Sequence, residues 1–281
     1  MTEQHFRKIG LLHHPKIPES LHLAQEMAGY LEERGVSPWL CSAWDENEVA
    51  RHVGDFDLLI TLGGDGTILR AARIAAGHSV PILGLNLGRV GFLAEMELED
   101  WPEKLQRVLT GEYWLEERVM LHADLWRGGN ALGDFEALND VVIGRTSLAR
   151  VVRLATYIDG SYLTTYVADG LIVATATGST AYALAVGGPI LPPELRNILL
   201  IPVASYLSLD RAIVLSEGAK VEIEVSTDHR AILTIDGQIH TEVEDADRVT
   251  VGASPHTCRF VRLQDRAYFY HNLMKRLRLP T

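Results

Sequence analysis

The sequence predicts an α/β fold joined to a β fold: an N-terminal parallel-sheet α/β domain with a β-sandwich-like second domain. Three observations lead to this prediction. Over residues 1–100, strand and helix patterns alternate, as in a parallel sheet covered by helices. From about residue 115, one strand pattern follows another, and residues 265–279 return to a helical pattern. We therefore expect one domain to contain residues 1–100 plus 265–281 and the other to contain residues 101–264.

The first domain is expected to contain short apolar strands separated by helices. The helix Pro18–Glu33 carries apolar residues at helical spacing and is followed by Gly35. The strand Asp57–Leu62 is nearly all apolar, which is typical of a strand covered on both faces. The other expected strands are Lys8–Leu12, Val36–Cys41 and Pro81–Asn86, and the other expected helix is Ile68–Ala76.

The second domain is expected to consist mainly of strands and tight turns. Val221–Val225 alternates apolar and charged residues, as in a sheet with one face in water. Asp159-Gly160 and Asp236-Gly237 are dipeptides typical of tight turns. The expected strands are Met120–Trp126, Ala137–Gly144, Val151–Ile158, Leu163–Thr175, Ile198–Val203, Lys220–Ser226, Ala231–Ile235 and Arg248–Val251.

Composition excludes several classes of partner. The chain of 281 residues has a formal net charge of −11, which argues against binding to nucleic acid or to anionic membranes. No apolar run reaches the roughly 18–20 residues that span a bilayer. Met1–Ile9 has no apolar signal-peptide core, and Cys41 and Cys258 match no metal or redox spacing. We expect a cytoplasmic protein whose partners are small molecules.

A glycine-rich loop follows the apolar strand directly and is the most informative segment of the sequence. It comprises Gly63, Gly64, Asp65, Gly66 and Thr67 and leads into a helix. Glycines let a phosphate approach the backbone, and the amides at a helix N-terminus bind anions. Thr67 is expected to cap this helix. A tight turn with a polar aspartate is the alternative, but ligands bind at the carboxyl ends of such strands, which favours a functional loop.

The glycine loop lacks the lysine of a P-loop, so the donor phosphates need another source of positive charge. We expect a divalent metal ion, taken to be Mg²⁺, together with backbone amides, although the histidines form no metal-ligand pattern and no residue is assigned as a metal ligand. Asp65 is the candidate general base, which would orient an acceptor hydroxyl and take its proton. A second glycine-rich loop, residues 84–92, includes Asn86 and also follows a strand.

Four segments resemble the NAD kinase family in the order in which that family carries them. They are Gly63–Thr67, Gly84–Phe92, Ala137–Val142 and Asp169–Tyr182. The last is similar to the family pattern D-G-x-I-x-x-T-x-T-G-S-T-A-Y over almost its whole length. The first is shared with diacylglycerol and sphingosine kinases, whereas T-G-S-T-A-Y is far more specific.

The resemblance implies transfer of a phosphoryl group from ATP or polyphosphate to the 2′-hydroxyl of the adenosine ribose of NAD, which gives NADP. It places Asp65 and Gly66 at the reacting ribose and Asn139 and Asp140 on ribose hydroxyls. It also implies a homo-oligomer, a dimer or tetramer, in which a neighbouring subunit completes the dinucleotide site. The remaining residues that it implies in binding NAD are Arg150, Asp169, Thr180, Ala181, Tyr182, Ala183, Leu184, Ala185 and Gln238.

Several of these residues also have a structural alternative. Asn139 and Asp140 fit an Asx turn at a strand edge, and a hairpin turn accounts for the sequence around Gln238. Arg150 is equally a solvated charge at a strand end. Ser179 and Thr180 fit the N-cap of a helix over residues 181–186. A lipid or other small-molecule kinase, and a non-catalytic protein that senses dinucleotides, are the rival functions.

Three departures from the family pattern affect the dinucleotide site. Position 140 is Asp where the family commonly has Glu, a family Pro-His pair is missing near residues 202–206, and Val167 replaces an arginine of some members. The choice between NAD and NADH therefore stays open at this point.

Overall fold

The structure is a computed structural model that describes residues 6–88, 91–146, 150–206, 209–270 and 273. The chain divides into two compact units, each described by itself below. Unit 1 comprises Met1–Glu117 and Thr257–Thr281, and unit 2 comprises Arg118–His256. The domain boundaries expected from the sequence, at residues 100 and 264, stay a prediction.

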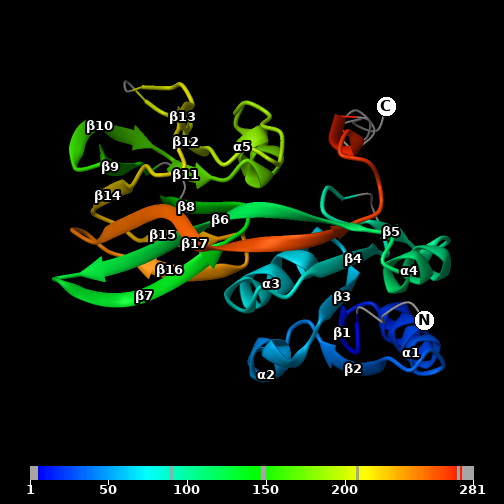
Figure 1. Cartoon of the computed structure of the whole chain (residues 1–281). Coiled ribbons are helices and arrows are strands. Elements are labelled where there is room, and N and C mark those ends of the chain that lie inside the picture. The colour runs from blue at the N-terminus through cyan, green and yellow to red at the C-terminus, as the bar shows by residue number, and fades with distance from the viewer. Residues whose placement is uncertain (1–5, 89–90, 147–149, 207–208, 271–272, 274–281) are drawn as a thin grey trace. The chain divides into compact units, whose positions relative to one another are not determined.

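Unit 1 contains a parallel sheet and its helices (Figure 1). The strands β2, β1, β3 and β4 lie side by side in this order, and β5 pairs with β4. Their bounds are β1 Lys8–His13, β2 Ser37–Ser42, β3 Leu58–Gly63, β4 Ile82–Asn86 and β5 Met96–Glu97. The helices are α1 Pro18–Glu32, α2 Glu46–His52, η1 Val53–Asp55, α3 Asp65–Ala75, η2 Ala76–His78 and α4 Trp101–Leu109. The α/β class predicted for this part is confirmed.

The helices α1 and α4 pack into the same buried core of unit 1. Apolar residues of both helices, among them Met27 and Leu105, share one buried cluster with side chains of β1, β3 and β4. The helix α3 packs against β3 and β4, and its Ile68 leaves no room for a β-carbon at Gly84. The sheet therefore fixes where β3 and β4 end, and both glycine loops begin at those ends.

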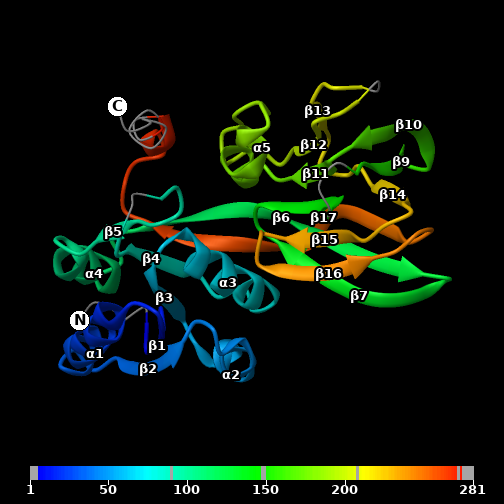
Figure 2. The same ribbon diagram turned by 180° about the vertical axis from the view of Figure 1, so that it is seen from behind.

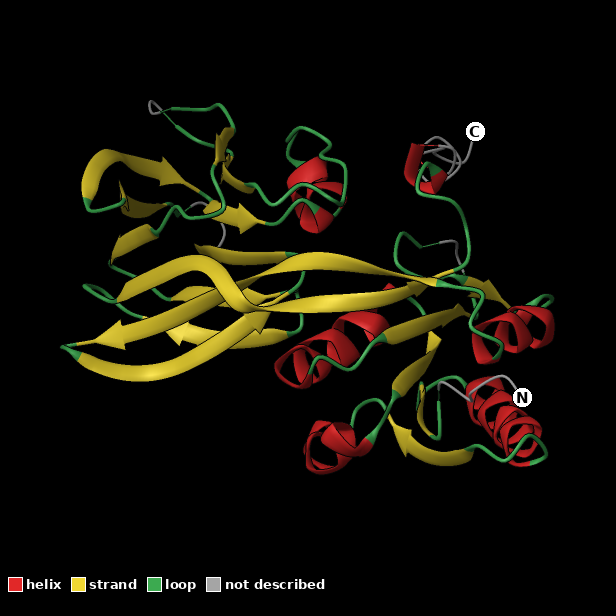
Figure 3. Ribbon diagram, in the orientation of Figure 1, coloured by secondary structure: helices red, strands yellow, loops and turns green. Residues whose placement is uncertain are grey.

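Unit 2 is a sandwich of two sheets, as Figures 2 and 3 show. One sheet has the order β10-β9-β14-β17-β6-β7 and the other β13-β12-β11-β8-β15-β16. The bounds in the first sheet are β6 Trp114–Arg127, β7 Asn130–Ala137, β9 Val152–Ile158, β10 Ser161–Ala168, β14 Val221–Ser226 and β17 Arg248–Arg262. In the second they are β8 Asp140–Arg145, β11 Gly170–Ala174, β12 Ile198–Val203, β13 Ile213–Leu215, β15 Ala231–Ile235 and β16 Ile239–Val243. A buried cluster joins apolar side chains from both sheets, so the predicted sandwich is confirmed.

The strand predicted over Leu163–Thr175 is wrong as a single element. The structure has β10 up to Ala168 and β11 from Gly170, with Asp169 between them. These two strands belong to different sheets, because β10 pairs with β9 whereas β11 pairs with β8 and β12. Asp169 therefore sits where the chain changes sheets.

Other sequence predictions need smaller corrections. The strand expected at Arg248–Val251 extends to Arg262, and β7, β13 and β16 were not predicted. Both predicted Asp-Gly turns are confirmed, since Asp159 and Asp236 each have a φ of 51° and are followed by glycines with positive φ. Within the helix predicted over residues 265–279, positions 268–270 and 273 are helical, and residues 271–272 and 274–279 lie outside the described residues. In the described part of the chain, no helix is both long and apolar enough to cross a membrane.

Candidate active site

Asp65 lies at the first residue of α3, where β3 ends, and its carboxylate is half-buried. One carboxylate oxygen accepts a hydrogen bond from the backbone N–H of Phe92 at 2.8 Å, and the other accepts from that of Leu93 at 3.2 Å. Phe92 is the last residue of the second glycine loop, and Leu93 follows it directly. The two glycine loops predicted from the sequence are therefore joined through the candidate catalytic carboxylate.

The close contact between the two loops requires glycine at position 91, because a β-carbon there would overlap the Asp65 carboxylate. Asn86, at the end of β4, is buried and closes the start of the second loop. Its side chain donates to the carbonyl of Gly88 at 3.0 Å and accepts from the Gly88 N–H at 3.3 Å. This side chain supports the loop, and its predicted place in a phosphate loop stays a prediction. Residues 89 and 90 of this loop lie outside the described residues.

The predicted capping role of Thr67 is wrong. The helix α3 begins at Asp65 with Gly64 at the N-cap, so Thr67 is already inside the first turn. Its side chain is buried against Gly63, where a β-carbon would overlap the hydroxyl. Gly63, Gly64 and the exposed Gly66 lie at the start of α3. Because glycines have no side chain, they do not cover the backbone N–H groups of the first turn.

The second group of predicted residues lies in unit 2, around the start of β8. Asn139 precedes β8 and Asp140 is its first residue. The backbone N–H groups of Leu138, Asn139 and Asp140 all donate to the carboxylate of Asp236, at 3.1, 2.7 and 3.1 Å. On the other side, the N–H of Thr175 donates to the Asn139 carbonyl at 2.9 Å.

Asp140 is 5% exposed, and its environment changes its acidity. Burial, together with the charge of Asp236, raises the pKa of Asp140 to about 7. At neutral pH this carboxyl group is therefore poised between its two protonation states, which is typical of functional carboxyl groups.

The T-G-S-T-A-Y segment packs directly on residues 138–140, which we call the Asn139 loop. Its first part is η3, Thr177–Thr180, and a β-carbon at Gly178 would overlap the backbone of Asn139. A short helix α5, Tyr182–Ala185, follows. The predicted N-cap role of Ser179 and Thr180 is wrong, because Ala181 occupies the N-cap without a side-chain cap. The buried Ser179 hydroxyl instead donates to the Ala176 carbonyl at 2.6 Å and accepts from the Leu191 N–H at 2.9 Å.

The members of this segment differ in exposure. Tyr182 and Ala185 are exposed, Ala183 is buried, and Thr180, Ala181 and Leu184 lie between these extremes. Tyr182 lines a pocket of about 330 Å³ together with Asp169 and Arg145. Arg145 donates to Asp169 at 2.8 Å, and this hydrogen bond holds the pKa of the Asp169 carboxyl below its usual range. The structure thus brings Asp169 and Tyr182 to one pocket.

Gln238 and Arg150 are placed differently from each other. The Gln238 N–H donates to the Ile235 carbonyl at 2.9 Å, two residues after Asp236 in the turn that holds the Asn139 loop. Arg150 is exposed and lies 3.7 Å from the Asp228 carboxylate. In the described part of the chain, no hydrogen bond or ion pair joins Arg150 to another predicted site residue.

Comparison with known proteins assigns the family. A family model of the ATP-NAD kinase N-terminal domain matches residues 23–113, and one of the ATP-NAD kinase C-terminal domain matches residues 138–263. The chain is 42% identical over 271 residues to the NAD kinase of Chloroflexus aurantiacus, covering 96% of this chain and 98% of that protein. It is 38% identical over 274 residues to the NAD kinase of Dehalococcoides mccartyi strain CBDB1, covering 97% and 96%. This chain belongs to the NAD kinase family.

Solved structures agree with that assignment. A yeast NADH kinase complexed with NADH has a TM-score of 0.84 at 24% identity, covering 99% of this chain and 91% of that one, and shows the fold. An NAD kinase from Archaeoglobus fulgidus in complex with ATP has a TM-score of 0.78 at 26% identity, covering 96% and 98%. The predicted resemblance to the NAD kinases and the predicted enzyme class, a phosphotransferase acting on NAD, are confirmed.

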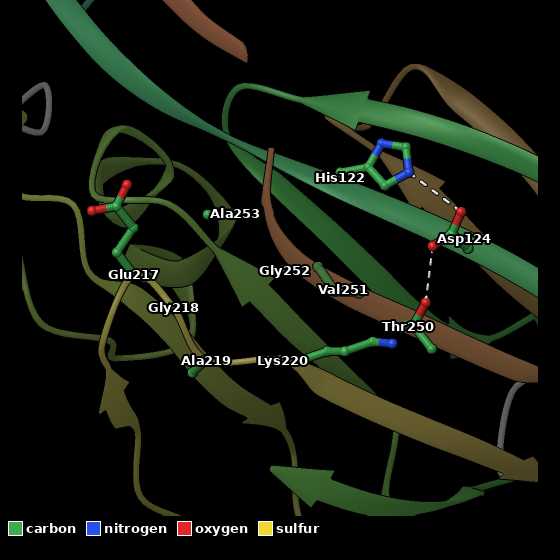
Figure 4. Close-up of a pocket in the computed structure, with 10 residues that line it drawn as sticks. All are labelled: His122, Asp124, Glu217, Gly218, Ala219, Lys220, Thr250, Val251, Gly252 and Ala253. Carbon is green, nitrogen blue, oxygen red and sulfur yellow. Dashed lines mark hydrogen bonds and ion pairs between the residues drawn. The ribbon is translucent and has the colours of Figure 1, made fainter. Parts of the chain in front are cut away.

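Another pocket of this NAD kinase, of about 580 Å³, lies in unit 2 among residues that no sequence pattern singled out (Figure 4). His122 and Asp124 of β6 line it, with Lys220 and Thr250. Burial disfavours a charged imidazole, but hydrogen bonds to Glu136 at 2.9 Å and Asp124 at 3.3 Å hold the pKa of His122 above its usual value. Thr250 donates to the other oxygen of Asp124 at 3.1 Å. Hydrogen bonds thus join Glu136, His122, Asp124 and Thr250 across β7, β6 and β17, and we interpret the cluster as structural.

Sequence reasoning missed Asp236, Thr175 and Arg145 as residues that hold the site. The sequence places Asp236 in a turn and in a weak C-terminal resemblance to the family, and Thr175 in the signature segment, without giving either a role in holding the site. Their partners are distant in the chain: Asp236 lies 96–98 residues from the amides it accepts, and Arg145 lies 24 residues from Asp169. No local pattern carries such contacts, although the Asp-Gly turn was a usable signal for an aspartate with an unusual backbone.

Proposed function

We propose that this enzyme transfers a phosphoryl group from ATP to the 2′-hydroxyl of the adenosine ribose of NAD and so forms NADP. The observation that carries the proposal is the position of Asp65. Its half-buried carboxylate is held by two backbone N–H groups at the start of a glycine-bounded helix. Such a carboxylate keeps a defined orientation while part of it faces solvent, which suits a group that orients a hydroxyl and accepts its proton.

The residues around Asp65 and Asp140 divide the remaining tasks. The loop of Gly63, Gly64, Gly66 and Thr67, with Asn86 beside it, would hold phosphates through backbone N–H groups. Asn139 and Asp140 would bind the ribose hydroxyls, since an amide donates and a carboxylate accepts. Asp169 and residues 180–185 would hold the dinucleotide, and two of them, Asp169 and Tyr182, line the same pocket. Gln238 and Arg150 are assigned to the same ligand, and Arg150 would exchange its contact with the Asp228 carboxylate for this ligand.

A divalent metal ion would neutralise the donor phosphates, and Mg²⁺ is the proposed ion. Among the described residues, no group of three or more His, Cys, Asp or Glu side chains is arranged to hold a metal ion. A protein site of that kind is not needed, because Mg²⁺ is commonly bound by one or two carboxylates together with substrate phosphates. Asp65 is the carboxylate in this part of unit 1 that fits such an ion.

Two further properties belong to the same proposal. We infer a homo-oligomer in which a neighbour completes the dinucleotide site, supported by Tyr182, which is 45% exposed although it belongs to the most specific signature. We also infer a cytoplasmic location, supported by Cys41 and Cys258, which are both described and form no disulfide.

A donor-and-acceptor panel on the purified enzyme tests the proposal. NAD, NADH, nicotinic acid adenine dinucleotide, diacylglycerol and sphingosine would each be incubated with ATP or polyphosphate and Mg²⁺. Phosphorus NMR of the product distinguishes a 2′-phosphate from a 3′-phosphate on the ribose. Phosphorylation of a lipid, or binding of NAD without turnover, would replace the proposed activity with one of the two rival functions. Equal turnover of NAD and NADH would leave the reaction in place and show that the enzyme does not discriminate between the two acceptors.

A further inference from the structure

Asp236 has an unusual set of contacts for a turn residue. It lies between β15 and β16, is 7% exposed, and adopts a φ of 51° that Gly237 continues at 63°. With this backbone conformation, the Asp236 carboxylate accepts hydrogen bonds from the three consecutive N–H groups of residues 138–140. Its own N–H donates to the Asp140 carbonyl at 2.9 Å. One side chain therefore fixes the backbone of the whole Asn139 loop.

The opposite side of the loop is also fixed. The hydroxyl of the fully buried Thr175 donates to the Leu138 carbonyl at 2.6 Å and accepts from the Gly178 N–H at 3.0 Å. The Thr175 N–H donates to the Asn139 carbonyl. With backbone contacts on both sides, Asn139 and Asp140 have little freedom to move away from one position.

Asp236 also acts on Asp140 through its charge. The residue opposite Asp140 on β11 is the uncharged Ala174, and Asp236 is the charged group that acts on it from the turn. The negative charge of Asp236 disfavours a second negative charge on the nearby Asp140. Asp236 thus affects both the position and the ionisation of Asp140.

We propose that Asp236 is a positioning residue for NAD binding, which sets the geometry of the Asn139 loop through the backbone N–H groups that its carboxylate accepts. The proposal rests on the proposed function of Asn139 and Asp140 as the groups that bind ribose hydroxyls. Asp236 itself touches neither substrate nor reacting atoms in this role. Its effect is transmitted through three backbone amides and one neighbouring carboxyl group.

The test compares NAD affinity of the full-length enzyme and its Asp236→Asn variant between pH 5.5 and 8.5. An asparagine oxygen accepts fewer N–H bonds, and its NH₂ group faces donors, so NAD affinity should fall by about tenfold. In the wild type, affinity should decrease as the pH falls through about 7, because a protonated Asp140 no longer accepts from two hydroxyls. In Asp236→Asn the midpoint of this decrease should move to lower pH, since a neighbouring negative charge is gone. Calorimetric titration with NAD alone keeps the readout independent of ATP ionisation.

Asp236→Glu is the second variant, and it carries the test if Asp236→Asn does not fold. It keeps the charge but lengthens the side chain, so NAD affinity should fall while the midpoint stays near that of the wild type. Asp159→Asn is the matched control, because Asp159 has the same φ and also starts an Asp-Gly turn. Its carboxylate accepts the Lys220 N–H at 2.9 Å in a turn other than the one that holds the Asn139 loop, and the variant should bind NAD as the wild type does.

The outcomes separate this proposal from the proposed function. If Asn139→Ala and Asp140→Asn bind NAD normally, the proposed function of the loop fails, whatever Asp236 does. If those two variants bind weakly while both Asp236 variants keep wild-type affinity and pH midpoint, the positioning role of Asp236 is overturned. A lower thermal stability of Asp236→Asn with unchanged affinity and midpoint overturns it as well, since Asp236 would then be structural only.

Discussion

Replacing Arg262 with methionine should strongly destabilise unit 1, although Arg262 belongs to neither glycine loop. Arg262 is 1% exposed and meets two buried carboxylates, Glu116 at 2.7 Å and Glu95 at 3.4 Å. It also donates to the carbonyl of Leu93 at 2.8 Å. The N–H of Leu93 in turn donates to Asp65, so the arginine supports the loop that orients the candidate base.

The magnitude follows from burial. Removing one partner from a buried ion pair leaves uncompensated charge and costs about 3–5 kcal/mol of unfolding free energy. At 2–4 °C per kcal/mol, a loss of about 4 kcal/mol lowers the melting temperature by roughly 8–16 °C. Arg259→Met is the matched control, because Arg259 lies on the same strand but its ion pair with Glu117, at 3.2 Å, is between side chains 37% and 50% exposed. Such a pair contributes about 0–1 kcal/mol.

Urea denaturation followed by tryptophan fluorescence measures both variants against the wild type. Adding Glu95→Gln and Glu116→Gln to Arg262→Met should recover part of the lost stability, since the uncompensated charges are then removed. Well below its melting temperature, Arg262→Met should also have a reduced kcat, because the Leu93 amide is no longer held toward Asp65. If the free energies of unfolding of Arg262→Met and Arg259→Met differ by no more than about 1 kcal/mol, the reasoning from buried charge is refuted.

Three further predictions follow from the candidate site. Asp65→Asn should lower kcat by a factor on the order of 10²–10⁴ with little change in NAD affinity. Asp57→Asn is its control, because Asp57 also accepts two consecutive backbone N–H groups in unit 1 but is no candidate base, and near-normal turnover of the Asp65 variant would remove that residue from the mechanism. Excess chelator should abolish turnover, whereas full activity would assign the neutralisation of the phosphates to a cationic side chain. Inactive variants at Asp65 and at Tyr182 should restore activity when they are assembled together, and a fully active monomer in sedimentation would contradict a shared site.

The sequence was most informative where function and local pattern coincide. Gly63–Thr67 follows a continuous apolar run, so both the buried β3 and the loop after it were predictable from neighbouring residues. The alternation in β14 and the two Asp-Gly turns are equally local. These signals located the strand ends, and the strand ends located the candidate site.

The remaining features depend on contacts that local patterns do not contain. The strand pattern at Leu163–Thr175 runs through Asp169 without interruption, yet the hydrogen-bond partners on its two sides come from different sheets. Thr67 looked like a cap because glycines precede it, but the helix starts earlier and buries its side chain. Arg262 meets Glu116 across 146 residues of sequence, which no local pattern predicts.

The two aspartates that join distant loops show how one interaction serves two purposes. Asp65 and Asp236 each accept backbone N–H groups from another loop, and both lie at the beginning of a turn or helix. Asp236 is almost completely buried and accepts three such groups, so it has no free face for a substrate. Asp65 accepts two and is half-buried beside the exposed Gly66, which leaves room for a hydroxyl at the carboxylate. The difference in exposure, rather than in chemistry, is the reason why we propose catalysis for Asp65 and positioning for Asp236.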